Sequence, residues 1–481
     1  MVGKAEVTTR TRDHSPTGAV TKPAYRIPLM TEIASIEPNG YTVVSTFSGC
    51  GGSCLGFRMA GFRPLWASEF IPEAAATYRA NHPETPLSTS DIRAVDPGDI
   101  LKRLGLVRGA IDVLEGSPPC ASFSTAGKRE ADWGKVTAYS DTKQRVDDLF
   151  FEYARLVDGL QPKVFVAENV SGLVKGTAKG YFIEILRALK ACGYVVQAKL
   201  LDAQWLGVPQ ARQRIIFVGV RNDLVERYGV VPAFPKPLPY RYSVRDALPW
   251  IAEVSGRTGP GEARTPSEID YPMNAVLVQD PAQTRYEVSD RSPRAYRDKR
   301  GAFGNDGDCT DTPAPTVLAD SVGTHWITGV GTAKGTRSID EPSPTVRKND
   351  RAKTTSELTL AIEPEADISR YAIGREWDRT AQGASNERYF SLKRASTEQP
   401  SQTVTQRGGD AGVASVTHPT ERRKFSIAEL RRICGFPDDF ILTGTYAQQW
   451  ERLGRAVPPP MMAAVATVIR DQILRRIPDG N

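Results

Sequence analysis

Between Tyr41 and about Arg221, short apolar runs alternate with longer segments whose apolar residues recur every three or four positions. The short runs have the length and the β-branched residues of buried strands, and the longer segments have the period of helices. The expected strands are YTVVSTF (41–47), GAIDVLEG (109–116), PKVFVAENV (162–170) and QRIIFVGV (213–220), and the expected helices are PEAAATYRANH (72–82), QRVDDLFFEYARLVDGL (144–160) and YFIEILRALKACG (181–193). Strands interleaved with helices predict an α/β fold with a parallel, doubly wound sheet.

The pattern divides the chain into four parts. Residues 1–38 are polar and lack periodicity, which predicts a flexible arm, and residues 39–225 contain the sheet domain. Residues 226–420 are rich in Pro, Gly, Thr, Asp and Arg and predict a second, irregular, β-rich domain. Residues 421–481 return to helical spacing and end in PPPMMAAVATVIRDQILRRI (458–477), an amphipathic helix expected to pack back on the sheet domain.

A glycine-rich loop and two acidic strand ends predict a nucleoside-binding edge. The loop TFSGCGGSCLGF (46–57) follows the first strand and opens a helix, where glycines let backbone amides approach a ligand. Its spacing differs from the GxGxxG dinucleotide fingerprint, which disfavours a nicotinamide or flavin oxidoreductase. Glu69 and Phe70 end the next strand and could hold ribose hydroxyls and cover a base, and Asp91 could accept from an exocyclic amine.

The segment GSPPCASFS places Cys120 after the strand 109–116, where open α/β sheets carry their chemistry. Taken alone, Cys120 is read as a buried thiol. However, Glu168 ends the next strand, and QARQR supplies Arg212 and Arg214 near a later one. A thiol, a carboxyl and two guanidiniums at neighbouring strand ends predict an active site.

Amino-acid composition narrows the class of protein. The chain has 481 residues, of which 40% are hydrophobic and 25% charged, and no apolar run of membrane-spanning length or secretory signal is seen, which predicts a cytoplasmic, non-membrane protein. Its six cysteines form no CxxC pair and it has four histidines, so no metal site is expected and the thiols are interpreted as reduced. The net charge of +6 suits a polyanionic partner.

In order along the chain, these segments resemble the DNA cytosine-C5 methyltransferase family. The matching segments are FSGCGG, SEF, DI, GSPPCASFS, AENV, QARQR, FSIAELRRICGFPDDF and GRAVPP. The resemblance implies a Rossmann-like S-adenosylmethionine-dependent catalytic domain over 39–225 and 421–481, and a target recognition domain over 226–420. It also implies double-stranded DNA as the substrate, from which the target cytosine is flipped out.

The resemblance also implies residue roles. Cys120 would add to C6 of cytosine, a protonated Glu168 would act on N3, Arg214 would bind O2 and Arg212 a nearby phosphate. S-adenosylmethionine would be held by Phe47, Gly49, Gly51, Glu69, Phe70, Asp91, Ile92, Pro119, Arg455, Ala456 and Val457. The loop after the nucleophile would close over DNA through Ser122, Ser124, Lys128 and Arg129.

Two positions depart from the family pattern, and two alternatives for the alkyl donor therefore remain. Ala121 replaces a glutamine that often follows the cysteine, and Arg455 replaces an asparagine in GRAV. Both changes fall beside the transferred group. Ordinary methyl transfer, with Arg455 turned to a phosphate, is one reading. The alternative is carboxymethyl transfer from carboxy-S-adenosylmethionine, with Arg455 pairing with the donor carboxylate to give 5-carboxymethylcytosine.

Other readings are weaker. An RNA cytosine-C5 methyltransferase would lack the long insert, and a non-catalytic DNA-binding relative would normally lose the cysteine or the glutamate. The expected setting is a monomer associated with the nucleoid of a prokaryotic or phage host, beside a cognate restriction endonuclease if one exists. Residues 226–420 contain no motif that is typical of one recognised DNA sequence.

Overall fold

A seven-stranded sheet organises the part of the chain that the computed structural model describes, residues 21–119, 137–139, 142–144, 148–174, 179–251 and 363–478. Its order is β3-β2-β1-β4-β7-β9-β8. The strands are β1 (Thr42–Thr46), β2 (Arg63–Ser68), β3 (Leu87–Ser88), β4 (Val113–Gly116), β7 (Val164–Val170), β8 (Tyr194–Asp202) and β9 (Gln213–Arg221). β5 (Thr137–Tyr139) and β6 (Thr142–Gln144) form a separate antiparallel hairpin.

The sheet is mostly parallel, with one strand reversed. β3, β2, β1, β4 and β7 are parallel, whereas β9 pairs antiparallel with both β7 and β8. The expectation of a doubly wound α/β fold is confirmed. The prediction of an entirely parallel sheet is wrong for β9, because β8 returns directly into β9 without a crossover helix. β9 therefore begins at the edge where the parallel strands end, and this places Arg214 beside the carboxyl end of β7.

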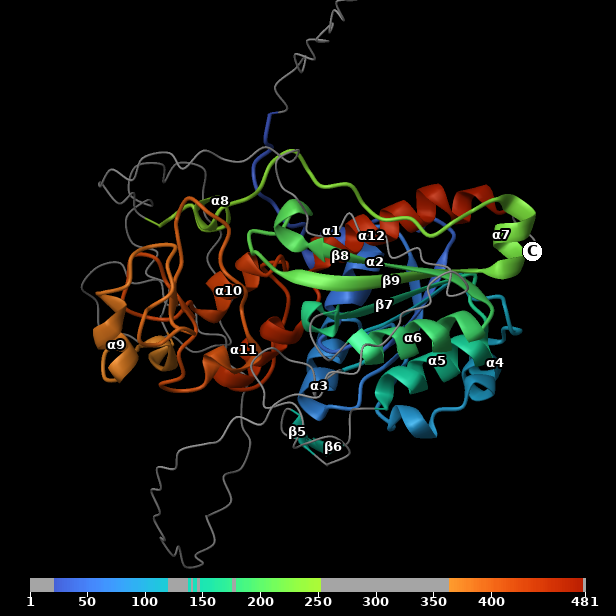
Figure 1. Ribbon diagram of the computed structural model, residues 1–481, viewed down its shortest axis with the longest axis horizontal. Coiled ribbons are helices and arrows are strands. Elements are labelled where there is room, and N and C mark those ends of the chain that lie inside the picture. Colours follow the sequence, from blue (N-terminus) through green and yellow to red (C-terminus); the bar gives the residue numbers. More distant parts are fainter. Residues whose placement is uncertain are drawn as a thin grey trace, which may run out of the picture. The chain divides into compact units, whose positions relative to one another are not determined.

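Helices cover both faces of the sheet (Figure 1). On one face lie α4 (Pro97–Leu104), α5 (Leu149–Leu160) and α6 (Lys179–Ala191), and on the other lie α2 (Gly52–Met59), α7 (Asn222–Tyr228) and α12 (Pro459–Gln472). α3 (Pro72–Asn81) follows β2. α12 lies against α2 so closely that a Cβ on Gly56 would come within 2.7 Å of the Cβ of Met462. The C-terminal helix thus packs on the sheet domain across a long sequence separation.

Residues 21–38 belong to the packed structure. The Tyr25 hydroxyl donates to the carbonyl of Arg432 at 2.7 Å, and Ile33 of α1 (Met30–Ala34) is buried. Lys22 forms an ion pair with Asp246, which lies in the short helix α8 (Val244–Ala247). These contacts differ from the flexible arm expected over 1–38, of which residues 1–20 lie outside the described residues.

The described residues between 363 and 424 contain little regular structure. α9 (Ala372–Trp377) and a parallel pair, β10 (Lys393–Arg394) with β11 (Val416–Thr417), are short. They precede α10 (Ile427–Ile433) and α11 (Tyr446–Arg455), whose apolar faces share one core with Val404 and Val416. Chain contacts place residues 1–276 and 363–481 in one unit and 277–362 in another, and the second unit lies outside the described residues. The domain boundaries at 225 and 420 stay a prediction.

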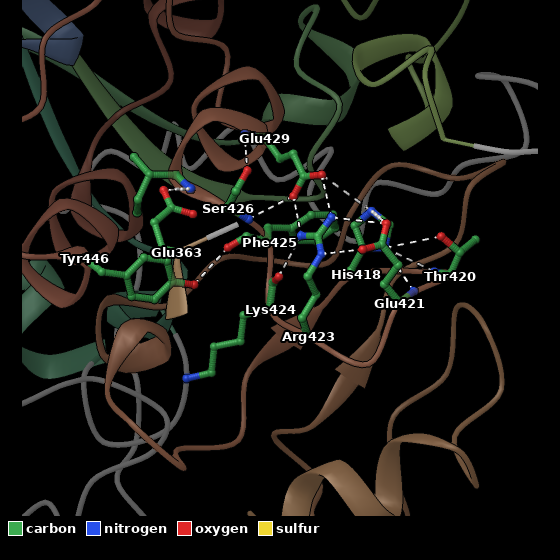
Figure 2. A network of polar contacts seen from close by, with 11 residues as sticks. Glu363, His418, Thr420, Glu421, Arg423, Lys424, Phe425, Ser426, Glu429 and Tyr446 are labelled. Atoms are coloured by element: carbon green, nitrogen blue, oxygen red, sulfur yellow. Dashed lines mark hydrogen bonds and ion pairs between the residues drawn. The ribbon is translucent and has the colours of Figure 1, made fainter. Parts of the chain in front are cut away.

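A buried ion pair holds the segment that leads into α10 (Figure 2). Arg423 donates through two nitrogens to Glu429 at 2.7 and 2.9 Å, and Glu429 also accepts from the Ser426 amide at 2.8 Å. Burial alone would raise the pKa of Glu429, but the bonds from Arg423 hold it below its usual value. Lys424 donates to the carbonyls of Gly408 and Asp410. The network ties the end of the irregular region to the helices beneath it.

We expect Arg423→Ala to lower the free energy of unfolding by about 3–5 kcal/mol, because it leaves Glu429 buried without its counter-ion. Arg422→Ala is the matched control, since its pair with Asp378 is largely exposed and should be worth at most about 1 kcal/mol. Thermal unfolding followed by calorimetry measures both. Equal losses for the two variants would contradict the role given to the buried pair.

Candidate active site

The glycine loop between β1 and α2 has the backbone of a ligand-binding turn. Phe47, Gly49 and Gly51 all have positive φ, at 51°, 57° and 93°. Such a conformation is uncommon for phenylalanine, and non-glycine residues held there cluster at functional sites. A Cβ on Gly51 would lie 2.5 Å from Nε2 of His82, and one on Gly52 would lie 2.4 Å from the Val457 carbonyl oxygen. The loop is therefore compressed between α3 and the GRAV segment.

Glu69 anchors this loop. Its two carboxylate oxygens accept from the amides of Gly49 and Ile71, each at 2.7 Å. Burial raises the pKa of Glu69, against the effect of these two bonds and of the Arg452 and Arg455 charges. A carboxylate offers about four lone-pair sites, so two remain for ligand hydroxyls.

The same loop faces open space. A Cβ built on Gly49 would meet no atom within 4 Å, and the ring of Phe70 is exposed. The residues present therefore fit the adenosine group of S-adenosylmethionine, with room beside Gly49 and a ring available to cover a base.

Asp91 begins the short turn Ile92–Ala94 and accepts from the Arg93 amide at 3.0 Å. The Arg93 side chain also bridges Asp91 and Asp148, at 3.0 and 2.6 Å. Ile92 is buried. The position at the end of β3 agrees with the sequence expectation, and Arg93 fixes the carboxylate in place.

Glu168 and Arg214 meet at the edge where β7 ends and β9 begins. Nε of Arg214 lies 2.6 Å from Oε1 of Glu168, and both side chains are nearly buried. Burial lowers the pKa of Arg214, and the Glu168 charge opposes this shift. The expectation that these two residues share a site agrees with the geometry. Their ion pair uses the carboxylate form of Glu168, whereas the family resemblance implied a protonated carboxyl.

The segment that leads to Cys120 starts beside this pair. Asn169 donates through Nδ2 to the carbonyl oxygen of Pro118 at 3.1 Å, and Pro119 is half-buried. Cys120, Ala121, Ser122, Ser124, Lys128 and Arg129 lie outside the described residues. The bond from Asn169 nevertheless fixes the chain two residues before Cys120 to the strand end that carries Glu168.

Arg212 is placed differently from its expected role at a phosphate. It is fully buried, and its guanidinium donates to the carbonyls of Val404 at 3.0 Å and Gly454 at 2.7 Å. Burial, with the nearby charge of Arg214, lowers the pKa of Arg212 to about 9. The geometry favours a positioning role, in which Arg212 joins the irregular region to the end of α11.

Arg455 ends α11 beside the glycine loop. Its guanidinium lies 2.7 Å from the carboxylate of Glu451, one turn earlier. A Cβ on Gly52 would lie 3.5 Å from that of Ala456, and Val457 is buried. The expected neighbourhood of Arg455, Ala456 and Val457 with the glycine loop agrees with these contacts, but Arg455 already has a carboxylate partner within the protein.

Comparison with known families decides the identity. The model of the C-5 cytosine-specific DNA methylase family matches residues 41–471, which is most of the chain. The chain belongs to this family. The fold and the strand-end site of the methylase agree with that membership, and the family implies S-adenosylmethionine as the methyl donor.

Individual relatives agree with the family. The Type II methyltransferase M.AgeI of Thalassovita gelatinovora is 29% identical over 462 residues, covering 89% of the methylase and 98% of the relative. M.NgoPII of Neisseria gonorrhoeae is 37% identical over 198 residues, or 41% and 52% of the two chains. A prophage-encoded E. coli protein, assigned as a DNA modification methyltransferase, shares the fold with a TM-score of 0.54 at 18% identity, covering 90% of the methylase and 100% of that chain.

Two features of the methylase were not found from sequence. Glu115 is a fully buried carboxyl on the central strand β4, and Arg452 is a buried cation near Glu69. A charged residue inside the apolar run GAIDVLEG was a readable signal for Glu115, whereas the helical context of Arg452 gave none.

Within the described ranges, no group of three or more His, Cys, Asp or Glu could hold a metal ion. A membrane-spanning helix is likewise not found among those residues.

Proposed function

We propose that this methylase transfers a methyl group to C5 of a flipped cytosine through a covalent bond from Cys120. The observation that carries the proposal is the bond from Asn169 to Pro118, which ties the approach to Cys120 to the strand end bearing Glu168. Glu168 and Arg214 stand together at the edge of the sheet from which the glycine loop also leaves. Thiolate, carboxyl and guanidinium are the groups that this chemistry needs.

Each of the three residues would act on a different atom of the cytosine ring. Cys120 forms a bond to C6, which makes C5 nucleophilic. Glu168, a carboxylate in its pair with Arg214, would take up a proton from solvent when the base binds and donate it to N3, where the addition of the thiolate places negative charge. The planar fork of Arg214 has enough donors to hold Glu168 and O2 of the base together. After transfer, a water molecule takes the proton from C5, the electrons of that C–H bond re-form the C5–C6 double bond, and the Cys120 sulfur leaves C6 as a thiolate while N3 returns its proton to Glu168.

The loop at Phe47, Gly49 and Gly51, with Glu69 and Phe70, would hold S-adenosylmethionine. Asp91, Ile92, Pro119, Ala456 and Val457 would complete its surroundings. The bound cofactor supplies an electrophilic methyl group. Glu69 would accept from ribose hydroxyls through the lone pairs that Gly49 and Ile71 leave available.

DNA in which 5-fluorocytosine replaces the target base should form a covalent complex with the enzyme and S-adenosylmethionine, because the fluorine at C5 cannot leave as a proton. Cys120→Ser should form no complex and lose turnover, since an alcohol is too weakly acidic to add at C6, while it still binds DNA. Denaturing electrophoresis and mass spectrometry detect the adduct. A Cys120→Ser enzyme with appreciable turnover would refute the covalent mechanism.

We propose methyl as the transferred group in preference to carboxymethyl. The carboxymethyl alternative needs the Arg455 guanidinium for the donor carboxylate. Glu451 holds that guanidinium at 2.7 Å, so a second carboxylate would have to displace or share it. The paired charges also reduce the repulsion that an unpaired Arg455 would exert on a sulfonium.

In competition between S-adenosylmethionine and excess carboxy-S-adenosylmethionine, the native enzyme should make 5-methylcytosine, and Arg455→Asn should keep this product. Glu451→Gln is the informative partner variant, because it releases Arg455 and should increase 5-carboxymethylcytosine. Nucleoside mass spectrometry measures both products. Carboxymethylcytosine from the native enzyme, lost in Arg455→Asn, would establish the alternative instead.

We further propose that residues 226–420 recognise duplex DNA and that their described part offers a contact at Phe390. This ring is 77% exposed, with Nζ of Lys393 at 5.9 Å from its centroid. Asn386 fixes the turn by accepting from the amides of Arg388 and Tyr389 at 3.0 and 2.8 Å. A rigid turn that presents an aromatic ring among cations is suited to base edges and phosphates.

Phe390→Ala should weaken binding to target DNA by about 10- to 150-fold, because burial of a phenylalanine side chain in an interface is worth about 1.5–3 kcal/mol. The salt dependence should not change, because no charge is removed. Val107→Ala, which truncates an equally exposed apolar side chain on the sheet domain, is the control. Fluorescence anisotropy at several salt concentrations gives both quantities, and unaltered affinity for Phe390→Ala would exclude the contact.

The relatives named above as Type II methyltransferases support a modification role beside a cognate endonuclease. Sequencing of methylated sites in treated DNA would identify the target, and a nuclease blocked at those sites would support the pairing. Scattered methylation without a shared sequence would oppose it.

A further inference from the structure

The central strand of the sheet carries a buried carboxyl that the reaction above does not use. Glu115 is 1% exposed and lies on β4 opposite Ser45 of β1. Among the described residues, no lysine or arginine forms an ion pair with Glu115. Burying an uncompensated carboxyl costs free energy, so its partners matter.

Among the described residues, the hydrogen-bond partners of its carboxylate belong to the two ends of the glycine loop. One carboxylate oxygen accepts from the Ser45 hydroxyl at the end of β1, and the other accepts from the Ser53 hydroxyl in the first turn of α2 at 2.7 Å. The Ser45 hydroxyl in turn lies 2.7 Å from that of Ser48, inside the loop. Glu115 therefore joins the strand before the loop, the loop itself and the helix after it.

We propose that Glu115 is a positioning residue for the cofactor, which sets the shape of the glycine loop through Ser45 and Ser53 and links cofactor affinity to pH. The inference rests on the proposed binding of S-adenosylmethionine at this loop. Glu115 touches hydroxyl groups of the protein and acts on the cofactor through them and through its charge.

The environment places the change of charge near neutral pH. Burial raises the pKa of Glu115 to about 7, while the bonds from Ser45 and Ser53 favour the carboxylate and the charge of Glu168 disfavours it. Besides Glu168, the ionisable groups that face it are Cys54 of α2, Tyr78 of α3 and Tyr153 of α5. Burial raises the pKa of Cys54 to about 12 and raises the pKa values of both tyrosines well above their usual value, so these three groups stay neutral in this window.

The direction of the pH effect follows from these charges. Below about pH 7 Glu115 holds a proton, and above it carries a negative charge beside the loop. S-adenosylmethionine carries a sulfonium, which favours the carboxylate, so its affinity should rise as the pH increases through 7. The contribution of Glu115 to folding has the opposite sense: the folded pKa is raised, so stability falls between about pH 4.5 and 7.

The test is the dissociation constant of S-adenosylmethionine for the full chain without DNA, measured by calorimetry from pH 6 to 8.5. For the native protein we expect an affinity gain of about three- to tenfold that Glu115→Gln lacks, with the Gln variant folded and similar at low pH. Ser53→Ala keeps the carboxyl but removes one donor, so the midpoint should move to higher pH. S-adenosylhomocysteine has the same amino group without the sulfonium. The difference in affinity between the native protein and Glu115→Gln should therefore be smaller for S-adenosylhomocysteine than for S-adenosylmethionine.

The outcomes separate the two proposals. If the native protein binds no S-adenosylmethionine, the proposed cofactor site fails. If it binds and the pH profiles of native and Glu115→Gln protein coincide, the role of Glu115 is overturned and the proposed methyl transfer stands. The same holds if S-adenosylmethionine and S-adenosylhomocysteine show the same difference in affinity between the two proteins. A Gln variant with a flat profile and a Ser53→Ala midpoint above the native one support the inference together.

Discussion

The ion pair between Glu168 and Arg214 depends on one reversed strand, and most of the candidate site follows from it. β7 ends at the carboxyl edge of the parallel strands, and only a strand that runs the other way can begin there beside it. The turn from β8 into β9 provides that reversal. The two side chains lie 2.6 Å apart, so the Glu168 carboxylate has its counter-charge at the sheet edge, and the proposed mechanism uses both groups on the base.

The strand and helix periods, the glycine loop and the acidic strand ends were readable from sequence because each depends on local spacing. The direction of β9 was not, because apolar runs in parallel and antiparallel central strands look alike. Arg212 shows a second limit. QARQR places two arginines two residues apart, but the structure uses one at the sheet edge and buries the other against the carbonyls of Val404 and Gly454. Those partners lie 192 and 242 residues later, beyond any local pattern.

Charge around the cofactor loop is balanced in pairs. Glu69 is held by two amides and by the fields of Arg452 and Arg455, and Arg455 is itself paired with Glu451. A substitution read in isolation therefore misleads. An arginine where relatives have asparagine suggests a new ligand charge, yet the preceding turn of α11 supplies the compensating carboxylate. Under the proposed function, the net charge of this pair favours S-adenosylmethionine over a carboxylated donor.

Glu115 is the exception to this pairing, and its position explains why it persists as a carboxyl. A neutral side chain on β4 would avoid the cost of burial but would offer at most one good acceptor, whereas a carboxylate accepts from Ser45 and Ser53 at once. The positive φ at Phe47 has to be maintained by its surroundings, since nothing in the phenylalanine itself favours it. Two hydroxyls fixed to one carboxylate at either end of the loop provide that constraint. A strained cofactor loop and a buried acid are then parts of one arrangement, in which the cost of burying charge is offset by the shape it imposes on the loop.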